Sequence, residues 1–250
     1  MTCPECELKR HYKVQKIGQF PSEITESSGL VFWNDSLYTL NDSGNDSVIF
    51  RVNPNTYEID SIIRIQHKNR DWEALEVNEN GLIIADIGNN LNNRKNLQLI
   101  YLDSEYSLKE IEPVIYPDQN AFPPQKQRDF NYDAEAVFHL HDHTFIIPKN
   151  RINKTVNLYK VSDSTTVEST FRLPVPITDV ALNGVELAIL TYGAIAFGKV
   201  YYLDGKLVIS LQEVRRITTR GQTEAIAWES DSTLLMSNER GRVFRITRSK

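Results

Sequence analysis

The sequence predicts an all-β protein: a five-bladed β-propeller with four antiparallel strands in each blade. Two observations about repetition support this fold. An acidic or hydroxyl residue that opens a short apolar run recurs at intervals of 45, 62, 44 and 45 residues. A strand-like run then ends in a polar loop 12 to 15 residues after each of these positions. A fixed period in this range is typical of repeat architectures, because each unit buries its apolar face only against its neighbours.

A third observation concerns local pattern: alternation of apolar and polar residues recurs between turn signals, and no convincing helix exceeds about two turns. Blades 1 to 4 have four predicted strands each. These strands span 29–33, 36–40, 47–53 and 57–65 in blade 1, and 73–78, 82–86, 97–102 and 110–116 in blade 2. They span 135–140, 144–148, 157–161 and 166–173 in blade 3, and 179–182, 186–190, 199–203 and 207–214 in blade 4. The fifth blade has three, at 224–228, 233–237 and 242–247. We therefore expect the N-terminal strand 11–20 to add as the outermost strand of the last blade and to close the ring, which leaves short, protected edges.

When the five segments are aligned, the recurring positions form one column. Its members are Ser28, Glu73, Glu135, Asp179 and Glu224. The polar loops downstream supply a second set of candidate ligand-binding residues, namely Asp42, Asp86, Asn89, Asn90, Lys149, Arg151, Asn238 and Arg240. In a propeller, the first strand of each blade lines a central channel, and its start opens on the same face as the loop after the second strand. Both sets are therefore predicted to meet at one mouth of the channel.

Composition limits the classes of function. The 250 residues are 40% hydrophobic and 24% charged, which is enough for one propeller domain over residues 11–250 behind a tail of residues 1–10. The net charge of −5 and the pI near 5.6 offer no basic surface to a nucleic acid polymer. No window approaches 18 consecutive apolar residues, so no transmembrane segment is expected. We expect a monomer.

Two segments lie outside the repeat. Cys3 and Cys6 form a lone Cys-x-x-Cys in the tail, with no second pair or nearby histidine to complete a zinc site. A plain tail, a local disulfide and the start of a trimmed lipoprotein acylated at Cys3 stay open as interpretations. The interval of 62 residues contains a Pro-, Gln- and charge-rich insertion at 118–132. We interpret it as a surface loop, either a binding lid or a tolerated insertion.

The first column predicts a concentration of negative charge. Four carboxylates about 6 Å apart around a narrow axis repel by roughly 2 to 3 kcal/mol per pair at an effective dielectric constant near 20, which sums to the order of 10 kcal/mol. This is comparable to the stability of a whole domain, so protons, basic partners or a bound cation must offset it. A set of oxygen ligands without histidine or thiol suits a hard cation, and a loose five-fold ring suits Ca²⁺ better than octahedral Mg²⁺.

Spacing alone leaves three interpretations of the column open: a Ca²⁺ site, carboxylates that bond backbone N–H groups of the next blade around a water-filled channel, and direct catalysis. Lys149, Arg151 and Arg240 beside an acidic ring would hold an anionic ligand that bridges to the metal, or would be ordinary surface charges or ion-pair partners of the ring. A histidine-rich segment contains His139, His141 and His143. Because it lies toward the far end of its strand, away from the ring, we interpret these histidines as solvated turn residues.

Several short motifs resemble those of exported bacterial propellers, including those related to esterase-like phytase domains. In chain order they are Leu37-Tyr38-Thr39-Leu40-Asn41-Asp42-Ser43-Gly44, Asp71-Trp72-Glu73-Ala74-Leu75, Ile84-Ala85-Asp86-Ile87-Gly88-Asn89-Asn90, Pro148-Lys149-Asn150-Arg151 and Thr223-Glu224-Ala225-Ile226. Their order and spacing are also similar to those of the five-bladed calcium-activated nucleotidases, the apyrases. The resemblance covers most of the chain after residue 20.

The nucleotidase resemblance implies an axial Ca²⁺ held by the column residues, with nucleotide diphosphate chemistry on the same face. The sequence departs from that pattern at Asp179, where a hydroxyl is expected, and its basic, aromatic nucleotide loops are thin. The resemblance also implies an extracytoplasmic location, periplasmic or secreted. Three hypotheses follow: a propeller with an axial Ca²⁺ site that binds a small, anionic or phosphorylated ligand, a Ca²⁺-dependent phosphoester hydrolase, and a non-catalytic protein-interaction scaffold.

Overall fold

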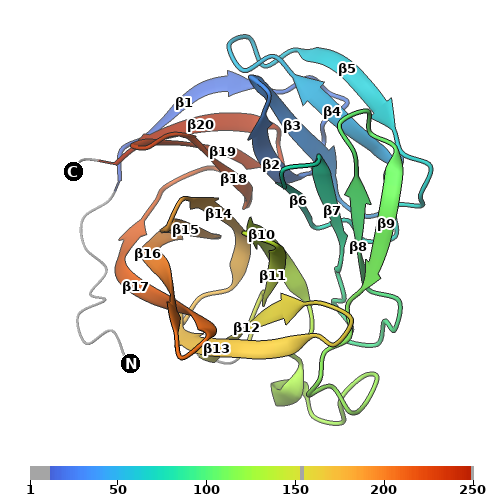
Figure 1. The fold of residues 1–250 in the computed structure, drawn as a ribbon. Helices are drawn as coiled ribbons and strands as arrows, with labels where there is room; N and C mark the ends of the chain where they lie inside the picture. Colours follow the sequence, from blue (N-terminus) through green and yellow to red (C-terminus); the bar gives the residue numbers. More distant parts are fainter. Residues whose placement is uncertain (1–11, 153–154, 249–250) are drawn as a thin grey trace.

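Five four-stranded antiparallel sheets surround a central axis in the computed structural model, which describes residues 12–152 and 155–248 (Figure 1). The predicted five-bladed β-propeller is therefore confirmed. The described residues contain a single short helical turn, η1 (Gln127–Asp129), within the insertion at 118–132. None of the described segments forms an apolar helix long enough to cross a membrane. The predicted tail, with Cys3 and Cys6, lies outside the described residues.

Blades 1 to 4 follow the order of the chain. Their strands are β2 (Ser27–Trp33), β3 (Ser36–Asn41), β4 (Val48–Val52) and β5 (Ile59–Arg64) in blade 1, β6 (Ala74–Val77), β7 (Leu82–Asp86), β8 (Gln98–Leu102) and β9 (Leu108–Pro113) in blade 2, β10 (Ala134–Leu140), β11 (His143–Pro148), β12 (Thr155–Val161) and β13 (Thr166–Arg172) in blade 3, and β14 (Ile177–Asn183), β15 (Glu186–Thr191), β16 (Ala194–Leu203) and β17 (Lys206–Arg216) in blade 4. Tight turns join them. Asn34 and Asp35 connect β2 to β3 with φ values of 46° and 58°, the left-handed conformation that a two-residue type I′ hairpin requires.

The N-terminal strand closes the ring, as the sequence predicted. Blade 5 has the order β1-β20-β19-β18, in which β18 (Thr223–Ser230), β19 (Thr233–Asn238) and β20 (Arg242–Thr247) come from the end of the chain. β1 (Val14–Gln19) pairs with β20 in antiparallel register, with Val14 opposite Ile246. Figure 1 shows β1, in blue, alongside β20, in red. The two ends of the described chain therefore hold each other in one sheet.

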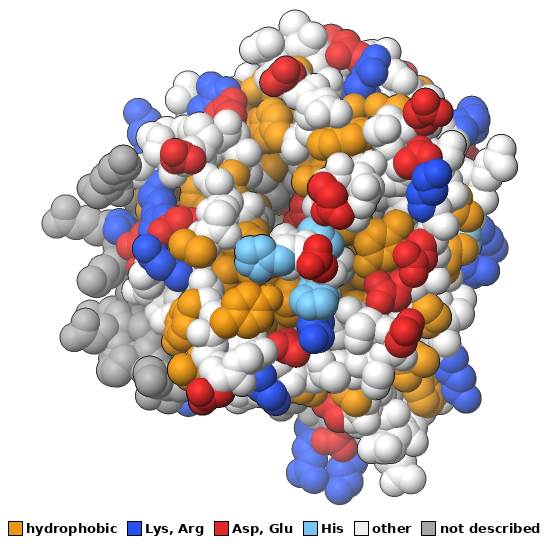
Figure 2. All heavy atoms as spheres, viewed as in Figure 1, with side chains coloured by type: hydrophobic (Ala, Val, Ile, Leu, Met, Phe, Trp, Pro, Cys, Tyr) orange, Lys and Arg blue, Asp and Glu red, His pale blue; other side chains and the backbone are white. Residues whose placement is uncertain are grey.

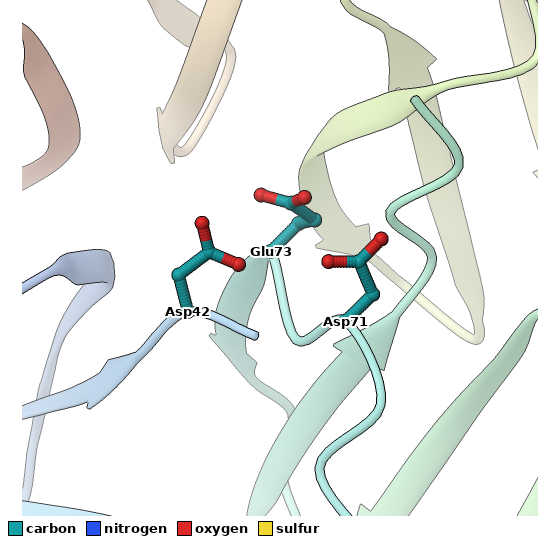
Figure 3. Close-up of side chains that lie close together, drawn as sticks. All are labelled: Asp42, Asp71 and Glu73. Carbon is teal, nitrogen blue, oxygen red and sulfur yellow. The ribbon is translucent and has the colours of Figure 1, made fainter. Parts of the chain in front are cut away.

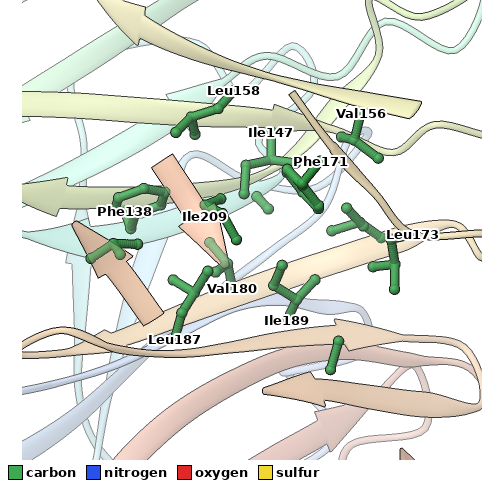
Figure 4. Packing of buried hydrophobic residues seen from close by; sticks show 14 of the residues in the cluster. Phe138, Ile147, Val156, Leu158, Phe171, Leu173, Val180, Leu187, Ile189 and Ile209 are labelled. Atoms are coloured by element: carbon green, nitrogen blue, oxygen red, sulfur yellow. The ribbon is translucent and has the colours of Figure 1, made fainter. Parts of the chain in front are cut away.

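The hydrophobic core is divided into five clusters, each between two adjacent blades. Between blades 3 and 4, for example, Phe138 and Ile147 pack with Val180 and Ile189 (Figure 4). The period of two along a strand supplies one apolar set to each face of a blade, so both faces are covered by neighbours. At about 25 cal/mol per Å² of buried apolar surface, these interfaces stabilise the ring as a whole.

The fourth blade differs from the prediction in one strand. β16 begins at Ala194, five residues before the expected start at 199. Its first half, Ala-Ile-Ala-Phe, is buried throughout and so lacks alternation. A bulge follows, in which the extra residue Gln212 of β17 lies opposite the step from Phe197 to Gly198. A Cβ atom at Gly198 would lie 2.6 Å from the carbonyl oxygen of Ser210, so this glycine allows β17 to approach closely.

A β-bulge at the start of the innermost strand positions side chains at the channel mouth. The register between the first two strands shifts at one residue in four blades, and these bulged residues are Ser28, Glu135, Thr178 and Glu224. A bulge inserts an extra residue and re-aims its side chain relative to the ladder. Three members of the predicted column are therefore bulge residues, whereas in blade 4 the equivalent place belongs to Thr178 and not to Asp179.

Candidate functional site: a carboxylate cluster at the channel mouth

One end of the central channel opens into a polar hollow of ≈ 300 Å³. Its lining residues are Glu26, Ser28, Asp42, Glu73, Asn90, Glu135, Lys149, Arg151, Tyr192, Gln222, Glu224 and Glu239. The structure thus brings together four residues of the predicted column, Ser28, Glu73, Glu135 and Glu224. From the second predicted set, Asp42, Asn90, Lys149 and Arg151 join them.

Asp179 is placed differently from the other column residues. One of its carboxylate oxygens accepts a hydrogen bond from the backbone N–H of Val180 at 2.8 Å, and the other accepts from the backbone N–H of Ile226 at 2.8 Å. The side chain therefore links blade 4 to blade 5. The position at the bulge is taken by Thr178, whose buried hydroxyl has no hydrogen-bond partner among the described residues. Thr178 lies fourteen residues before Tyr192, as Glu135 lies before Lys149, and this spacing was the signal for the correct alignment.

Two residues of the second set order the loop after β7. The buried Asp86 carboxylate accepts hydrogen bonds from Arg94 at 2.8 Å and from Gln98 at 2.9 Å. The backbone N–H of Asn89 donates to Asp133 at 2.7 Å. Both side chains are buried within their loop instead of lining the hollow, so they position its walls.

Asn238 and Arg240 occupy the loop after β19. The Asn238 side-chain oxygen accepts from the backbone N–H groups of Arg240 at 3.1 Å and Arg242 at 3.0 Å, which closes the turn. The Arg240 guanidinium is mostly exposed and lies 3.8 Å from the Glu239 carboxylate. Within the described chain, neither residue lines the hollow.

Two aspartates that the column did not include complete the acidic cluster. Carboxylate oxygens of Asp42, Asp71 and Glu73 lie within 4.8 Å of one another, and Figure 3 shows the three side chains pointing toward a common space. Oxygens of Glu73, Asp133 and Glu135 form a second group within the same distance. We call these the first and second carboxylate groups. Asp71 and Asp133 each precede a column glutamate by two residues, so the repeated Asp-x-Glu was a signal that sequence reasoning missed.

Glu73 belongs to both groups and is the least compensated of their members. It is 6% exposed, and its carboxylate has no hydrogen-bond donor among the described residues. Burial raises its pKa well above the usual range, and the surrounding carboxylates, with Glu135 the foremost, raise it further. Gly88 makes room for this arrangement, because a Cβ atom there would clash with the carboxylates of both Asp71 and Glu73.

Side-chain cations face the second group. The Lys149 ammonium donates a hydrogen bond to Glu135, and the Arg151 guanidinium contacts Asp133 at 2.9 Å. Burial alone lowers the pKa of Lys149, but the Glu135 carboxylate more than offsets this effect and holds it above the usual range. Of the basic partners that sequence reasoning considered for the ring, Lys149 and Arg151 are thus in contact with it.

The first group has less compensation. Its nearest cation among the described residues is Arg94, 3.8 Å from the Asp71 carboxylate and engaged mainly with Asp86. Burial, with a contribution from the Asp42 charge, raises the pKa of Asp71 to about 6. Burial likewise raises the pKa of Glu224, across the mouth, to about 7. Burial is the largest cause in both cases, as it is for Glu135, whose pKa is raised to about 8 although the Lys149 charge lowers it. A bound cation can replace protons held in this way.

The predicted histidine segment lies at the other end of β10. His141 and His143 are exposed as expected, but His139 is a strand residue whose side chain is 12% exposed and hydrogen-bonded to Thr144, so it is not a solvated turn residue. Figure 2 shows histidine and acidic side chains gathered near the centre of one face. A hollow of ≈ 660 Å³ is lined by His139 and Asp142 together with Glu79, Glu110 and Glu112. No histidine belongs to a group of three potential metal ligands among the described residues. Although this hollow is larger than the mouth, its acidic rim is mostly exposed, whereas Glu73 and Glu135 at the mouth are buried.

Comparison with known proteins supports the fold. No protein-family model and no curated protein sequence matches the chain. The crystal structure of glutaminyl cyclase from Myxococcus xanthus is similar, with a TM-score of 0.64 and 11% identity over 96% of this chain and 97% of that one. A streptogramin B lyase structure has a TM-score of 0.52 and 8% identity over 95% and 98% of the two chains. At these identities the likeness concerns the propeller architecture alone.

Proposed function

We propose that the channel mouth binds a divalent cation, Ca²⁺, in the first carboxylate group, and that the bound ion holds a small anionic or phosphorylated ligand. The carrying observation is the Glu73 carboxylate, which is more than nine-tenths buried, without a donor among the described residues, and within 4.8 Å of oxygens from Asp42 and Asp71. Burying an unpaired carboxylate costs several kcal/mol, and a cation removes this cost.

The chemistry of the donor set favours a hard cation. All three side chains offer carboxylate oxygens, which are the ligands that Ca²⁺ and Mg²⁺ prefer, and no histidine or thiolate takes part. They come from two separate loops, the one after β3 and the one before β6 (Figure 3). Such a set does not impose the strict octahedron of Mg²⁺ and suits the flexible coordination of Ca²⁺.

Open coordination positions lead to the ligand. Ca²⁺ takes six to eight oxygen ligands, and three monodentate carboxylates supply about half of them. Asp42 and Glu73 line the ≈ 300 Å³ hollow, so oxygens of a phosphate or carboxylate ligand in this hollow would be able to complete the coordination in place of water. Arg151, whose side chain is 43% exposed, flanks the same hollow and supplies hydrogen-bond donors for such an anion.

Calcium titration tests this proposal. Isothermal titration of the metal-free protein with Ca²⁺, in low salt at pH 7.5, is expected to show saturable binding that Asp42→Asn weakens. Inorganic phosphate is then titrated with and without Ca²⁺, and binding is expected only with the ion and less in Arg151→Gln. Absence of Ca²⁺ binding by the folded protein refutes the metal site and favours a protein-interaction scaffold.

A hydrolytic function is the second candidate, and the observation that favours it is Glu224. This residue lines the mouth and has its pKa raised to about 7 by burial, close to the value that suits a general base at neutral pH. In this reaction Glu224 would accept a proton from the attacking water, and a Ca²⁺ ion held by Asp42, Asp71 and Glu73 would supply Lewis-acid polarisation of the phosphoryl group. Release of phosphate from nucleotides or phosphoesters with Ca²⁺, and its loss in Glu224→Gln, would support hydrolysis. A glutaminyl cyclisation assay belongs in the same panel, because carboxylates without a counter-charge can also bind the amino group of a substrate.

A further inference from the structure

The two carboxylate groups differ in the cations that already face them. In the second group, Glu135 accepts a hydrogen bond from Lys149, and Asp133 accepts from Arg151 at 2.9 Å. Among the described residues, the first group takes part in one ion pair, between Asp71 and Arg94 at 3.8 Å. Glu73 is a member of both groups and has no donor of its own within the described chain.

We infer that the mouth is a two-cation centre in which the Lys149 ammonium takes the place of one metal ion. Glu73 then lies between an exchangeable divalent cation in the first group and a built-in cation in the second. The inference rests on the proposed function for the exchangeable ion, and it adds its location and its stoichiometry. It also explains why two adjoining sets of three carboxylates exist at one mouth.

The position of Lys149 is set by the backbone. Its N–H donates to the carbonyl oxygen of Asp133 at 2.7 Å, and its carbonyl oxygen accepts from the N–H of Ile177 at 2.9 Å. The residue follows directly after β11, so these bonds fix the start of its side chain between blades 3 and 4. The Nζ atom lies 5.1 Å from the centre of the Tyr192 ring, which covers it on one side. Lysine ordinarily extends its ammonium into water, and this one is held inside instead.

An ammonium is a suitable replacement for a hard cation. It is a compact point charge that donates to oxygen acceptors, whereas a planar guanidinium occupies more space and demands fixed directions. With Lys149 and Arg151 present, the three carboxylates of the second group meet two positive charges. Removal of the lysine leaves one guanidinium against three carboxylates and opens the space next to Glu135. That space then has the charge and the oxygen ligands that a divalent cation requires.

The test is the number of Ca²⁺ ions bound per chain, measured by equilibrium dialysis with metal analysis. Wild type is expected to bind one ion and Lys149→Met two. Lys199→Met is the matched control, because Lys199 also forms a lysine–glutamate pair, with Glu186 at 2.8 Å, but lies outside the mouth. The control is expected to bind one ion. The double variant Lys149→Met with Glu135→Gln lacks a ligand of the second group and is also expected to bind one.

Each outcome separates this inference from the proposed function. If wild type and Lys149→Met each bind one ion, the inference is wrong and the proposed calcium site still holds. The same conclusion follows if wild type binds two ions. If wild type binds no ion and Lys149→Met binds one, the first group is not a Ca²⁺ site. The inference that Lys149 occupies a cation position in the second group then still holds. No ion in either protein overturns both.

Stability supplies a second measurement, because Lys149→Met leaves Glu135 buried without its partner. Without Ca²⁺, the thermal unfolding midpoint of Lys149→Met is expected to be lower than that of wild type. Addition of Ca²⁺ is expected to raise this midpoint by more than it raises the midpoint of wild type. A Lys149→Met protein that stays unfolded in saturating Ca²⁺, while the double variant folds, contradicts the inference because the vacated space does not accept the ion.

Discussion

Replacing Glu73 by glutamine tests the cation site most directly, since the change removes a charge and keeps the side-chain shape. The Glu73 carboxylate lies within 4.8 Å of oxygens from both Asp42 and Asp71. Two unit charges 4 Å apart interact by about 1 kcal/mol in water and about 4 kcal/mol at an effective dielectric constant near 20, so the interaction with a divalent ion is about 2 to 8 kcal/mol. The lower limit already corresponds to a Ca²⁺ affinity about 30-fold weaker.

The same substitution is expected to stabilise the metal-free protein. An ionised neighbour within 4.8 Å contributes a repulsion of at least about 3 kcal/mol at an effective dielectric constant near 20. Protons bound by the cluster already relieve part of this repulsion, so we expect a gain of about 1 to 3 kcal/mol in the free energy of unfolding at pH 7.5. Glu73→Gln should therefore be more stable than wild type without Ca²⁺ and respond less to its addition.

Calorimetric titration gives the affinity, and thermal unfolding with and without Ca²⁺ gives the stability. Glu239→Gln is the control, because Glu239 lines the mouth but belongs to neither carboxylate group. Its Ca²⁺ affinity should change by less than about threefold, as expected for a screened charge outside direct contact. Equal Ca²⁺ affinities for wild type and Glu73→Gln would refute the reasoning, and so would an equal loss in both variants.

Three further predictions concern the surroundings of the site. Gly88→Ala places a Cβ atom against the carboxylates of Asp71 and Glu73, so we expect an unchanged circular dichroism spectrum and a Ca²⁺ affinity at least tenfold weaker; an unchanged affinity would show that these carboxylates do not bind the ion. The pKa of Asp71 is raised to about 6 from 3.8, so its contribution to the stability of the metal-free fold is complete below pH 4 and is lost as the pH rises through 6, by up to about 3 kcal/mol. Ca²⁺ competes with the same protons, so its affinity should increase from pH 5 to 7, and a titration series with no pH dependence would contradict this assignment. Asp179→Ala leaves the buried N–H of Ile226 without its acceptor, which should cost about 1 to 3 kcal/mol in urea unfolding with no change in Ca²⁺ affinity; a lost affinity would return Asp179 to the site.

The blades could be predicted from the sequence because strand signals act over a few residues. Apolar alternation and turns such as Asn34-Asp35 specify each hairpin locally, and the missing strand of the last repeat required the N-terminal strand for closure. The same dependence on local pattern made the predicted range of β16 too short. Its first half is buried on both faces, and a continuous apolar run carries no period to detect.

The candidate site was predicted in outline, from one residue per blade. The spacing placed Ser28, Glu73, Glu135 and Glu224 at one mouth, but it gave Asp179 the place of Thr178. The difference is one residue. The register shift between β14 and β15 falls at Thr178, and the next residue, Asp179, accepts hydrogen bonds from backbone N–H groups. The bulge that decides the matter is a property of the paired strands.

The periodicity of the sequence determines the order of the blades, their number and the gathering of acidic residues, because it can be read from one repeat to the next along the chain. It does not determine which partner each charged group meets. Glu135 meets an ammonium, Asp179 meets a backbone N–H of the next blade, and Glu73 meets neither among the described residues. These carboxylates look alike along the chain, and they differ because closure of the ring brings distant loops within a few ångströms, where burial and the nearest donor set the state of each group.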